Sequence, residues 1–172
     1  MLGLWNKSYR EHIPSRYGAD ESYLLAEKFL HGLDVEDWGC GHQRFKDYHV
    51  GGYIGIDGSD NGIPATITAD LRERAEYSQG ILLRHVLEHN RDWRKVLKNA
   101  LKSYTHTLVI VLFTPLHERT HELCFTPAVG VPDIGFSLSD LRAELPAKVE
   151  EHLDIKSPST QYGVEHLFVV RK

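Results

Sequence analysis

The feature that most constrains the fold is the continuous apolar run Thr107–Phe113, TLVIVLF. A strand with one face in water alternates apolar and polar residues, whereas a strand covered on both faces stays apolar along its length. The run is short for a buried helix and rich in β-branched residues, which favours a strand. It therefore predicts the central strand of a sheet that has helices on both faces.

The chain before this run alternates between short apolar stretches and amphipathic ones. Helical spacing predicts one helix over Glu21–Gly32, with Asp20 as its cap, and a second helix that Asn90 caps. In the second helix the apolar residues at helical spacing are Trp93, Val96, Leu97, Ala100 and Leu101. Strands are predicted at Asp34–Trp38, Tyr53–Asp57, Thr66–Thr68 and Gly80–Arg84, the third of them at an edge of the sheet.

After the central run, the segment Leu116–Phe136 contains two prolines and no clear period, so we expect it to be irregular. It is the sizeable loop that could shape a pocket. Ser137 or Ser139 can cap the short helix that follows. The final predicted strands, Val149–Lys156 and Val164–Arg171, are too close together for an intervening helix and should form an antiparallel pair.

Strands that alternate with helices predict an α/β fold with a mostly parallel sheet, because each crossover helix must pack back on that sheet. The 172 residues, 41% of them hydrophobic, suit a single domain with one core. The sequence contains no internal repeat and no linker that would divide it.

Composition narrows the possible partners and compartments. The formal net charge of −4 does not favour nucleic acid, although a local basic patch would still permit it. We expect no membrane span and no export signal. The two cysteines, Cys40 and Cys124, form no CxxC pair, so a reducing cytoplasm is the expected compartment. No feature specifies an oligomeric state.

The segment Asp37-Trp38-Gly39-Cys40-Gly41, called the glycine loop below, follows the first predicted strand. Its glycines let the backbone turn sharply and approach a ligand closely, although Gly39 and Gly41 alone would equally fit a tight turn. The ligand interpretation is favoured by Asp57, which ends the next strand, where a carboxylate can accept hydrogen bonds from both hydroxyls of a ribose.

These segments resemble the class I S-adenosylmethionine (SAM)-dependent methyltransferases. Their first motif, an acidic residue followed by Gly-x-Gly, is similar to Val35–Gly41, and their ribose-binding strand end is similar to Tyr53–Asp57. Further similar segments are Thr68–Leu71, where the Asp of the family contacts the adenine, Gly80–Asn99 with its turn Val86-Leu87-Glu88-His89, and Gly135–Leu141. The resemblance runs from about residue 15 to the C-terminus.

The resemblance implies a Rossmann-like domain with a seven-stranded, mostly parallel sheet whose last strand is antiparallel. It divides the chain into an N-terminal helical segment (1–32), a cofactor-binding half (33–113) and an acceptor-side half (114–172). It also implies methyl transfer from SAM, with S-adenosylhomocysteine as product, to a small or macromolecular acceptor. The predicted cofactor-binding residues are Tyr17, Asp37, Trp38, Gly39, Cys40, Gly41, Asp57, Gly58, Asp70, Leu71, Arg84 and His85.

The sequence also departs from the family. Gln43 replaces the third glycine of the commonest first motif, and the stretches from Gly41 to the second strand and from Asp57 to Asp70 are short. We therefore expect shortened helices between the first three strands. The same fold could bind the cofactor without catalysis and serve as a partner or scaffold.

Several side chains are candidates for the chemistry of methyl transfer. Aromatic faces and carboxylates favour a positive sulfonium, which suggests Tyr17, Asp37 and Trp38 as its neighbours, although Trp38 would equally suit the core. If the acceptor is a hydroxyl it needs a base, and His85 and His89 follow the fourth predicted strand. His89 and its neighbour Glu88 also have a purely structural interpretation, at the start of a helix.

The motif His117-Glu118-Arg119-Thr120-His121 matches HExxH, in which two histidines on one helical face bind zinc in metalloproteases. It follows a strand directly and lacks a long apolar helical stripe, which argues against a metal-dependent hydrolase and for no bound metal. Glu144 is one acidic residue among many that could serve as a third ligand. For His117 and His121, a non-proteolytic metal-binding role stays open beside contact with the acceptor, to which we assign them.

Overall fold

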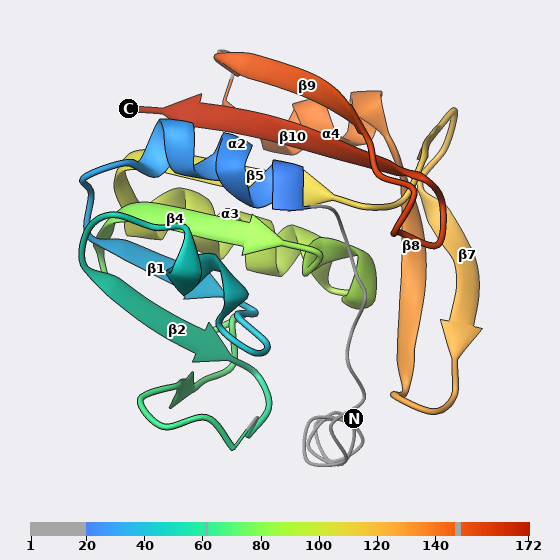
Figure 1. The fold of residues 1–172 in the computed structure, drawn as a ribbon. Coiled ribbons are helices and arrows are strands. Elements are labelled where there is room, and N and C mark those ends of the chain that lie inside the picture. Colours follow the sequence, from blue (N-terminus) through green and yellow to red (C-terminus); the bar gives the residue numbers. More distant parts are fainter. Residues whose placement is uncertain (1–19, 61, 147–148) are drawn as a thin grey trace.

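The computed structural model describes residues 20–60, 62–146 and 149–172. Its main sheet has seven strands in the order β3-β2-β1-β4-β5-β10-β9 (Figure 1). The strands are β1 (Val35–Trp38), β2 (Tyr53–Asp57), β3 (Ile67–Thr68), β4 (Ser78–Arg84), β5 (Tyr104–Leu112), β9 (Glu151–Lys156) and β10 (Val164–Arg171). The first five are parallel, and β10 is antiparallel to both β5 and β9. The predicted fold class is confirmed.

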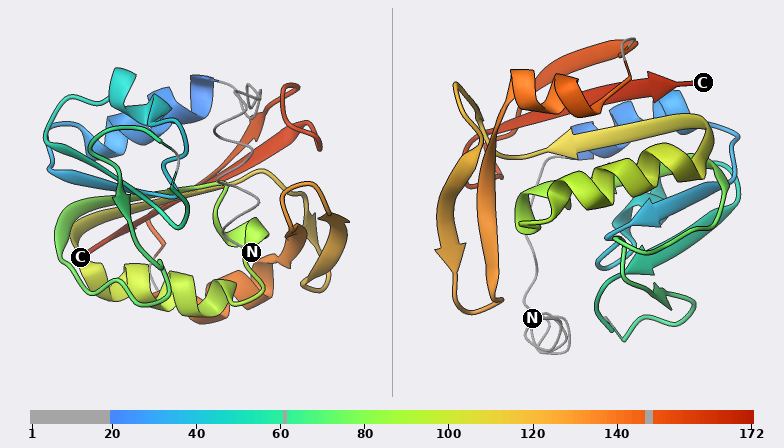
Figure 2. Two further views of the ribbon diagram at one scale, coloured as in Figure 1. Left: turned by 90° about the horizontal axis from the view of Figure 1, so that it is seen from below. Right: turned by 180° about the vertical axis from the view of Figure 1, so that it is seen from behind.

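Helices cover both faces of this sheet. Helix α2 (Asp20–Leu30) lies on one face, and α3 (Trp93–Ser103) and α4 (Leu138–Glu144) lie on the other (Figure 2). Alternate residues of β5 enter two hydrophobic clusters: Leu108 and Ile110 pack on the α3 side, and Val109 and Val111 on the α2 side. The apolar run therefore belongs to a strand buried on both faces, as predicted. None of the helices in the described part of the chain has the length and apolar character that crossing a bilayer requires.

The first crossovers are short, as expected. A single 3-10 turn, η1 (Arg44–Asp47), lies between β1 and β2. Between β2 and the two-residue edge strand β3, the described residues contain no helix. The carboxyl ends of β1 and β2 therefore carry little besides their own loops.

Of the predicted caps of α3 and α4, the one for α4 is confirmed and the one for α3 was wrong. Ser137 caps α4, since its hydroxyl oxygen accepts the Asp140 N–H at 3.0 Å. Asn90 does not cap α3, which begins at Trp93 behind the one-turn 3-10 helix η2 (Leu87–His89). The Asn90 amide instead donates to the Val86 carbonyl at 2.6 Å, because η2 places that carbonyl within reach of the side chain.

The expectation of an irregular segment at 116–136 was wrong. A second sheet forms there in the order β6-β8-β7, from β6 (Leu116–His117), β7 (His121–Thr126) and β8 (Val131–Ser137). Pro132 lies within β8 opposite Phe125, and a turn closed by the Gly130 N–H bond to Thr126 O, at 2.8 Å, joins β7 to β8. The prediction failed because it treated prolines as strand breakers, whereas this hairpin accommodates Pro132 within a strand. It stands beside the ends of β4 and β5 (Figure 2).

Candidate functional site

The glycine loop bends around the end of β2. Gly39 and Gly41 have φ of 76° and 51°, in the left-handed region that glycine adopts without a steric penalty. The Gly39 and Cys40 amides both donate to the Ile56 carbonyl, at 2.7 and 3.0 Å. A Cβ on Gly39 would lie 2.4 Å from Cγ2 of Val86, so the loop also packs closely on the turn after β4.

Asp57 joins the loop after β1 to the loop after β2. Its two carboxylate oxygens accept the Gly41 N–H at 3.0 Å and the Ser59 N–H at 2.8 Å. The side chain is buried, with 6% of the residue exposed. The two residues that the ligand interpretation paired in the sequence are therefore in direct contact, at the edge of the sheet where ligands bind in such folds.

Gln43 takes the position of the missing third glycine. Its φ of 57° lies in the left-handed region, so its backbone has the conformation that a glycine would favour. The side-chain amide donates to the Thr66 hydroxyl at 2.6 Å. That contact ties the glycine loop to the segment before β3 and accounts for a long polar side chain at this position.

Asp37 is a buried carboxyl group on the α2 side of the sheet. Its Oδ2 accepts the Tyr53 hydroxyl at 2.8 Å. Burial raises the pKa of Asp37 to about 7, against the lowering effects of the Tyr53 hydrogen bond and of the Arg84 charge. The group therefore carries a proton for part of the time near neutral pH.

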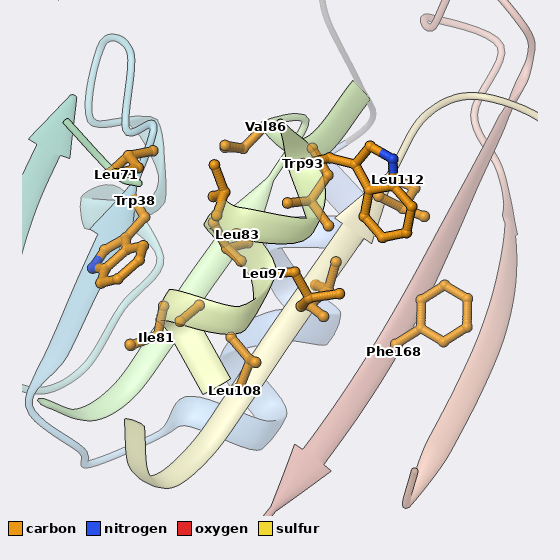
Figure 3. Close-up of a cluster of buried hydrophobic side chains, with 14 of the residues drawn as sticks. Trp38, Leu71, Ile81, Leu83, Val86, Trp93, Leu97, Leu108, Leu112 and Phe168 are labelled. Atoms are coloured by element: carbon orange, nitrogen blue, oxygen red, sulfur yellow. The ribbon is translucent and has the colours of Figure 1, made fainter. Parts of the chain in front are cut away.

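Trp38 is a core side chain, which agrees with the alternative interpretation of this residue, and contact of its ring with the sulfonium stays a prediction. The residue is completely buried on the α3 side, next to Leu71 (Figure 3). Its indole N–H donates to Glu36 Oε2 at 2.7 Å, and Arg74 pairs with the same carboxylate. A side chain at Trp38 points to the opposite face from Asp37 because neighbouring residues of a strand alternate.

The other predicted cofactor residues lie around the same edge. Cys40 is buried, and burial raises the pKa of its thiol. Gly58 follows Asp57 directly. Asp70 is half exposed and pairs with Arg72 at 2.6 Å, which lowers the pKa of Asp70. These assignments remain predictions, as does that of Leu71, whose side chain is in the core. Tyr17 lies outside the described residues.

Arg84 and His85 join a buried network at the ends of β4 and β10. Both contact one oxygen of Glu165: Arg84 Nη2 lies 2.9 Å and His85 Nε2 2.6 Å from Oε1. Arg84 Nε donates to the Ser22 hydroxyl at 3.0 Å, and its guanidinium lies over the Tyr23 ring. Burial, assisted by the Arg84 charge, lowers the pKa of His85 to about 3 despite the contact with Glu165. His85 is therefore neutral and a weak base.

His89 forms a dyad with Asp133 of β8. His89 Nδ1 lies 3.3 Å from Asp133 Oδ1 and 3.0 Å from the Pro132 carbonyl. Burial by itself would lower the pKa of His89, but the hydrogen bond to Asp133 and the charge of Glu88 outweigh it and raise the pKa. Burial by itself would raise the pKa of Asp133, but the hydrogen bond and the charge of His89 outweigh it and lower that pKa. The electrostatics favour His89 over His85 as a base.

Aromatic and polar groups surround this dyad. The Phe113 ring lies 4.9 Å from the His85 ring and 5.3 Å from the His89 ring, between centroids. The Tyr162 hydroxyl donates to Asp133 Oδ2 at 3.2 Å. Sequence reasoning missed Glu165, Asp133 and Tyr162. Asp133 lies in the segment that was expected to be irregular, and Tyr162 lies between the last two predicted strands. Glu165 belongs to no recognisable motif.

The HExxH motif is not helical. The hydrolase alternative requires both histidines on one face of a helix, and the structure contradicts that requirement. His117 belongs to β6 and His121 begins β7, with their rings 4.8 Å apart in an edge-to-face arrangement. Glu144 pairs with Arg94 at 3.0 Å instead of approaching them. The motif lines a surface hollow of about 560 Å³. Contact of His117 and His121 with an acceptor stays a prediction.

The sequence matches no family model and no curated protein. Solved structures do match. Burkholderia thailandensis 1,6-didemethyltoxoflavin-N1-methyltransferase, with bound 1,6-didemethyltoxoflavin and S-adenosylhomocysteine, is similar over 99% of this chain and 88% of its own, with TM-score 0.73 and 16% identity. This chain has the methyltransferase fold.

Two further structures support this assignment of the fold. Magnesium protoporphyrin IX methyltransferase from Synechocystis PCC 6803, with bound SAM, matches with TM-score 0.62 and 14% identity over 99% of this chain and 81% of its own. A SAM-dependent methyltransferase from Mesorhizobium loti matches with TM-score 0.63 and 13% identity over 88% of this chain and 96% of its own.

Proposed function

We propose that this chain is an enzyme that binds SAM at the glycine loop and transfers its methyl group to a nucleophilic acceptor. The observation that carries the proposal is the contact of Asp57 with the Gly41 and Ser59 amides at the ends of β1 and β2. Proteins of the same fold have been solved with SAM or S-adenosylhomocysteine bound, which supports the choice of ligand.

The residues at this edge fit a nucleoside. An ionised carboxylate can accept up to about four hydrogen bonds, and the two amides set the orientation of Asp57 before any ribose arrives. Gly41 carries no side chain and donates its N–H to that carboxylate, so a ligand can approach the loop backbone closely. The buried setting strengthens each hydrogen bond to the charged group.

Bound SAM supplies a methyl group on a positively charged sulfonium, which is already activated for direct displacement. The protein then needs to hold donor and acceptor in line and to exclude water, and it needs no covalent intermediate. The second sheet stands at the ends of β4 and β5, where the Thr114 hydroxyl donates to the Ile134 carbonyl at 2.7 Å. We assign the acceptor to the space that this sheet borders.

An acceptor hydroxyl or amine must also lose a proton, and His89 is the base that we assign. The contacts of Nδ1 with Asp133 and the Pro132 carbonyl place the ring proton there, so Nε2 is the nitrogen that accepts a proton. Asp133 holds the ring in this tautomer and stabilises its charged form. His85, with its pKa lowered to about 3, serves better as part of the buried wall.

Titration calorimetry with SAM and S-adenosylhomocysteine tests the proposal directly. We expect micromolar binding by the unmodified chain and a loss of about 10- to 100-fold in Asp57→Ala, because hydrogen bonds to a charged group contribute roughly 1.5–3 kcal/mol each. Asp47→Ala, which removes an exposed carboxylate in η1, is the matched control and should bind normally.

The possible outcomes separate the alternatives. Absence of nucleoside binding by a folded chain would refute the proposal, and unchanged affinity in Asp57→Ala would refute the role of that residue. Normal binding with no release of S-adenosylhomocysteine in the presence of hydroxyl and amine acceptors would favour a cofactor-binding scaffold. Loss of product release in His89→Gln, with binding intact, supports the assigned base.

A further inference from the structure

A cluster of two histidines and one aspartate lies at the β9–β10 edge of the sheet. The antiparallel register places Asp154 opposite His166 and His152 opposite Phe168. Since side chains at alternate positions of a strand share a face, and opposite residues are neighbours, His152, Asp154 and His166 project from one side of the hairpin. Strands β4 and β5 lie between this hairpin and β1, which carries the glycine loop.

Both rings point a nitrogen at the same carboxylate oxygen. His166 Nδ1 lies 2.6 Å and His152 Nε2 lies 3.2 Å from Asp154 Oδ1. One potential ligand atom from each of the three residues can be chosen so that all lie within 4.8 Å of one another. Imidazole nitrogens and a carboxylate oxygen are the donor set that Zn²⁺ and similar ions prefer.

The rings are held in place while the carboxylate faces solvent. The side chains of His166 and His152 are 8% and 23% exposed, whereas that of Asp154 is 70% exposed. His152 stacks on Phe168, with centroids 4.3 Å apart and planes at 11°. Two ligands are thus largely buried, and the third is open to an ion that enters from solvent.

One of the two histidines is also incompletely satisfied by the protein. Within the described ranges, His166 Nε2 is buried and has no hydrogen-bond partner. Buried polar atoms without partners are uncommon in folded proteins and call for an explanation. His152 Nε2 already contacts the carboxylate at 3.2 Å, so an ion between them would replace that contact with two metal–ligand bonds.

We propose that His152, Asp154 and His166 bind a divalent transition-metal ion of the Zn²⁺ type. Zinc lies about 2.0–2.2 Å from such ligands in tetrahedral geometry, so two ligand atoms on one ion are roughly 3.3–3.6 Å apart. The 2.6 Å contact between His166 Nδ1 and Asp154 Oδ1 must therefore open to admit the ion, while any wider separation among the three ligand atoms must close. Three protein ligands leave a position for water. Mg²⁺ and Ca²⁺ prefer sites made only of oxygen ligands and should not compete. The ion would fasten the edge strand β9 to β10.

The test is calorimetric titration of Zn²⁺ into the full chain after dialysis against a chelator. We expect one saturable site with micromolar affinity and a higher melting temperature with Zn²⁺. Asp154→Asn and His152→Phe should each weaken binding about tenfold or more. Asp154 is largely exposed, and Phe can keep the stacking on Phe168, so both variants should fold, as circular dichroism will check.

The paired histidines of the second sheet supply the control. The double variant His117→Gln/His121→Gln removes the other neighbouring pair and should bind Zn²⁺ as tightly as the unmodified chain. Titration with Mg²⁺ should give no saturable heat. The proposal is overturned if Zn²⁺ does not bind, if Asp154→Asn retains full affinity, or if the double variant abolishes binding. None of these results depends on whether the chain binds SAM.

Discussion

Asp37→Asn should stabilise the protein, and the gain should grow with pH. Asp37 is a buried carboxyl group whose pKa burial raises from 3.8 to about 7. The folded state therefore binds a proton more tightly than the unfolded state does. Stability from this group is fully present below about pH 4 and is lost as the pH rises through about 7. Asparagine has no proton to lose and can still accept the Tyr53 hydroxyl.

The size of the effect follows from the two pKa values. Each unit of difference corresponds to about 1.4 kcal/mol, so a shift from 3.8 to about 7 costs about 4 kcal/mol above pH 7. Relaxation of the structure around the ionised group will reduce this, and we expect a gain of about 2–4 kcal/mol at pH 8 that falls to under about 1 kcal/mol at pH 4.

Urea unfolding at several pH values between 4 and 8 measures this gain for the variant against the unmodified chain. Glu88, whose pKa burial also raises to about 7, should leave some pH dependence in Asp37→Asn, and Glu88→Gln should reduce it further. The exposed Asp47→Asn is the control and should keep the original dependence on pH. A stability difference that is the same at pH 4 and pH 8, or a variant less stable at pH 8, would refute the reasoning.

Three further predictions concern the core and the dyad. Gly39→Ala should cost about 2 kcal/mol or more in urea unfolding, because of its positive φ and the contact with Val86, and Val86→Ala should recover part of that loss if the contact is real. Trp93→Ala should cost about 3–5 kcal/mol, since the ring is buried edge-to-face on Phe136, and a cost below 1 kcal/mol would contradict this packing. Asp133→Asn should lower the pKa of His89, which an NMR titration measures, because the hydrogen bond to Asp133 raises that pKa; an unchanged value would exclude the dyad.

The main sheet was predictable because its strands carry strong local signals. The Thr107–Phe113 run and the glycine-bounded Tyr53–Asp57 stretch indicate buried strands whatever surrounds them, and both are strands in the structure. The second sheet carries no such signal. Strand β7 (His121–Thr126) is mostly half-buried or exposed, and β8 contains a proline, so neither shows the alternation or the apolar run that marks a strand.

The site was predictable to the extent that its geometry follows from strand ends. Gly41 and Asp57 were expected to meet because adjacent parallel strands end at the same edge, and they do. The partners of the histidines were not predictable. Glu165 reaches His85 from 80 positions along the chain, and Asp133 reaches His89 from a strand that the sequence concealed. Contacts of this kind depend on tertiary packing, which local sequence patterns do not encode.

The placement of β10 between β5 and β9 has a consequence for the order of folding. β9 precedes β10 in the chain but joins the sheet only through it, and β10 pairs with β5 across a long intervening segment. Such distant pairings are slow to form because the loop must close before its contacts stabilise it. In an intermediate without β10, the apolar edge of β5 would be open to strands of other chains. Pairing of β10 with β5 covers that edge, so we expect aggregation to compete with folding only until this pairing forms.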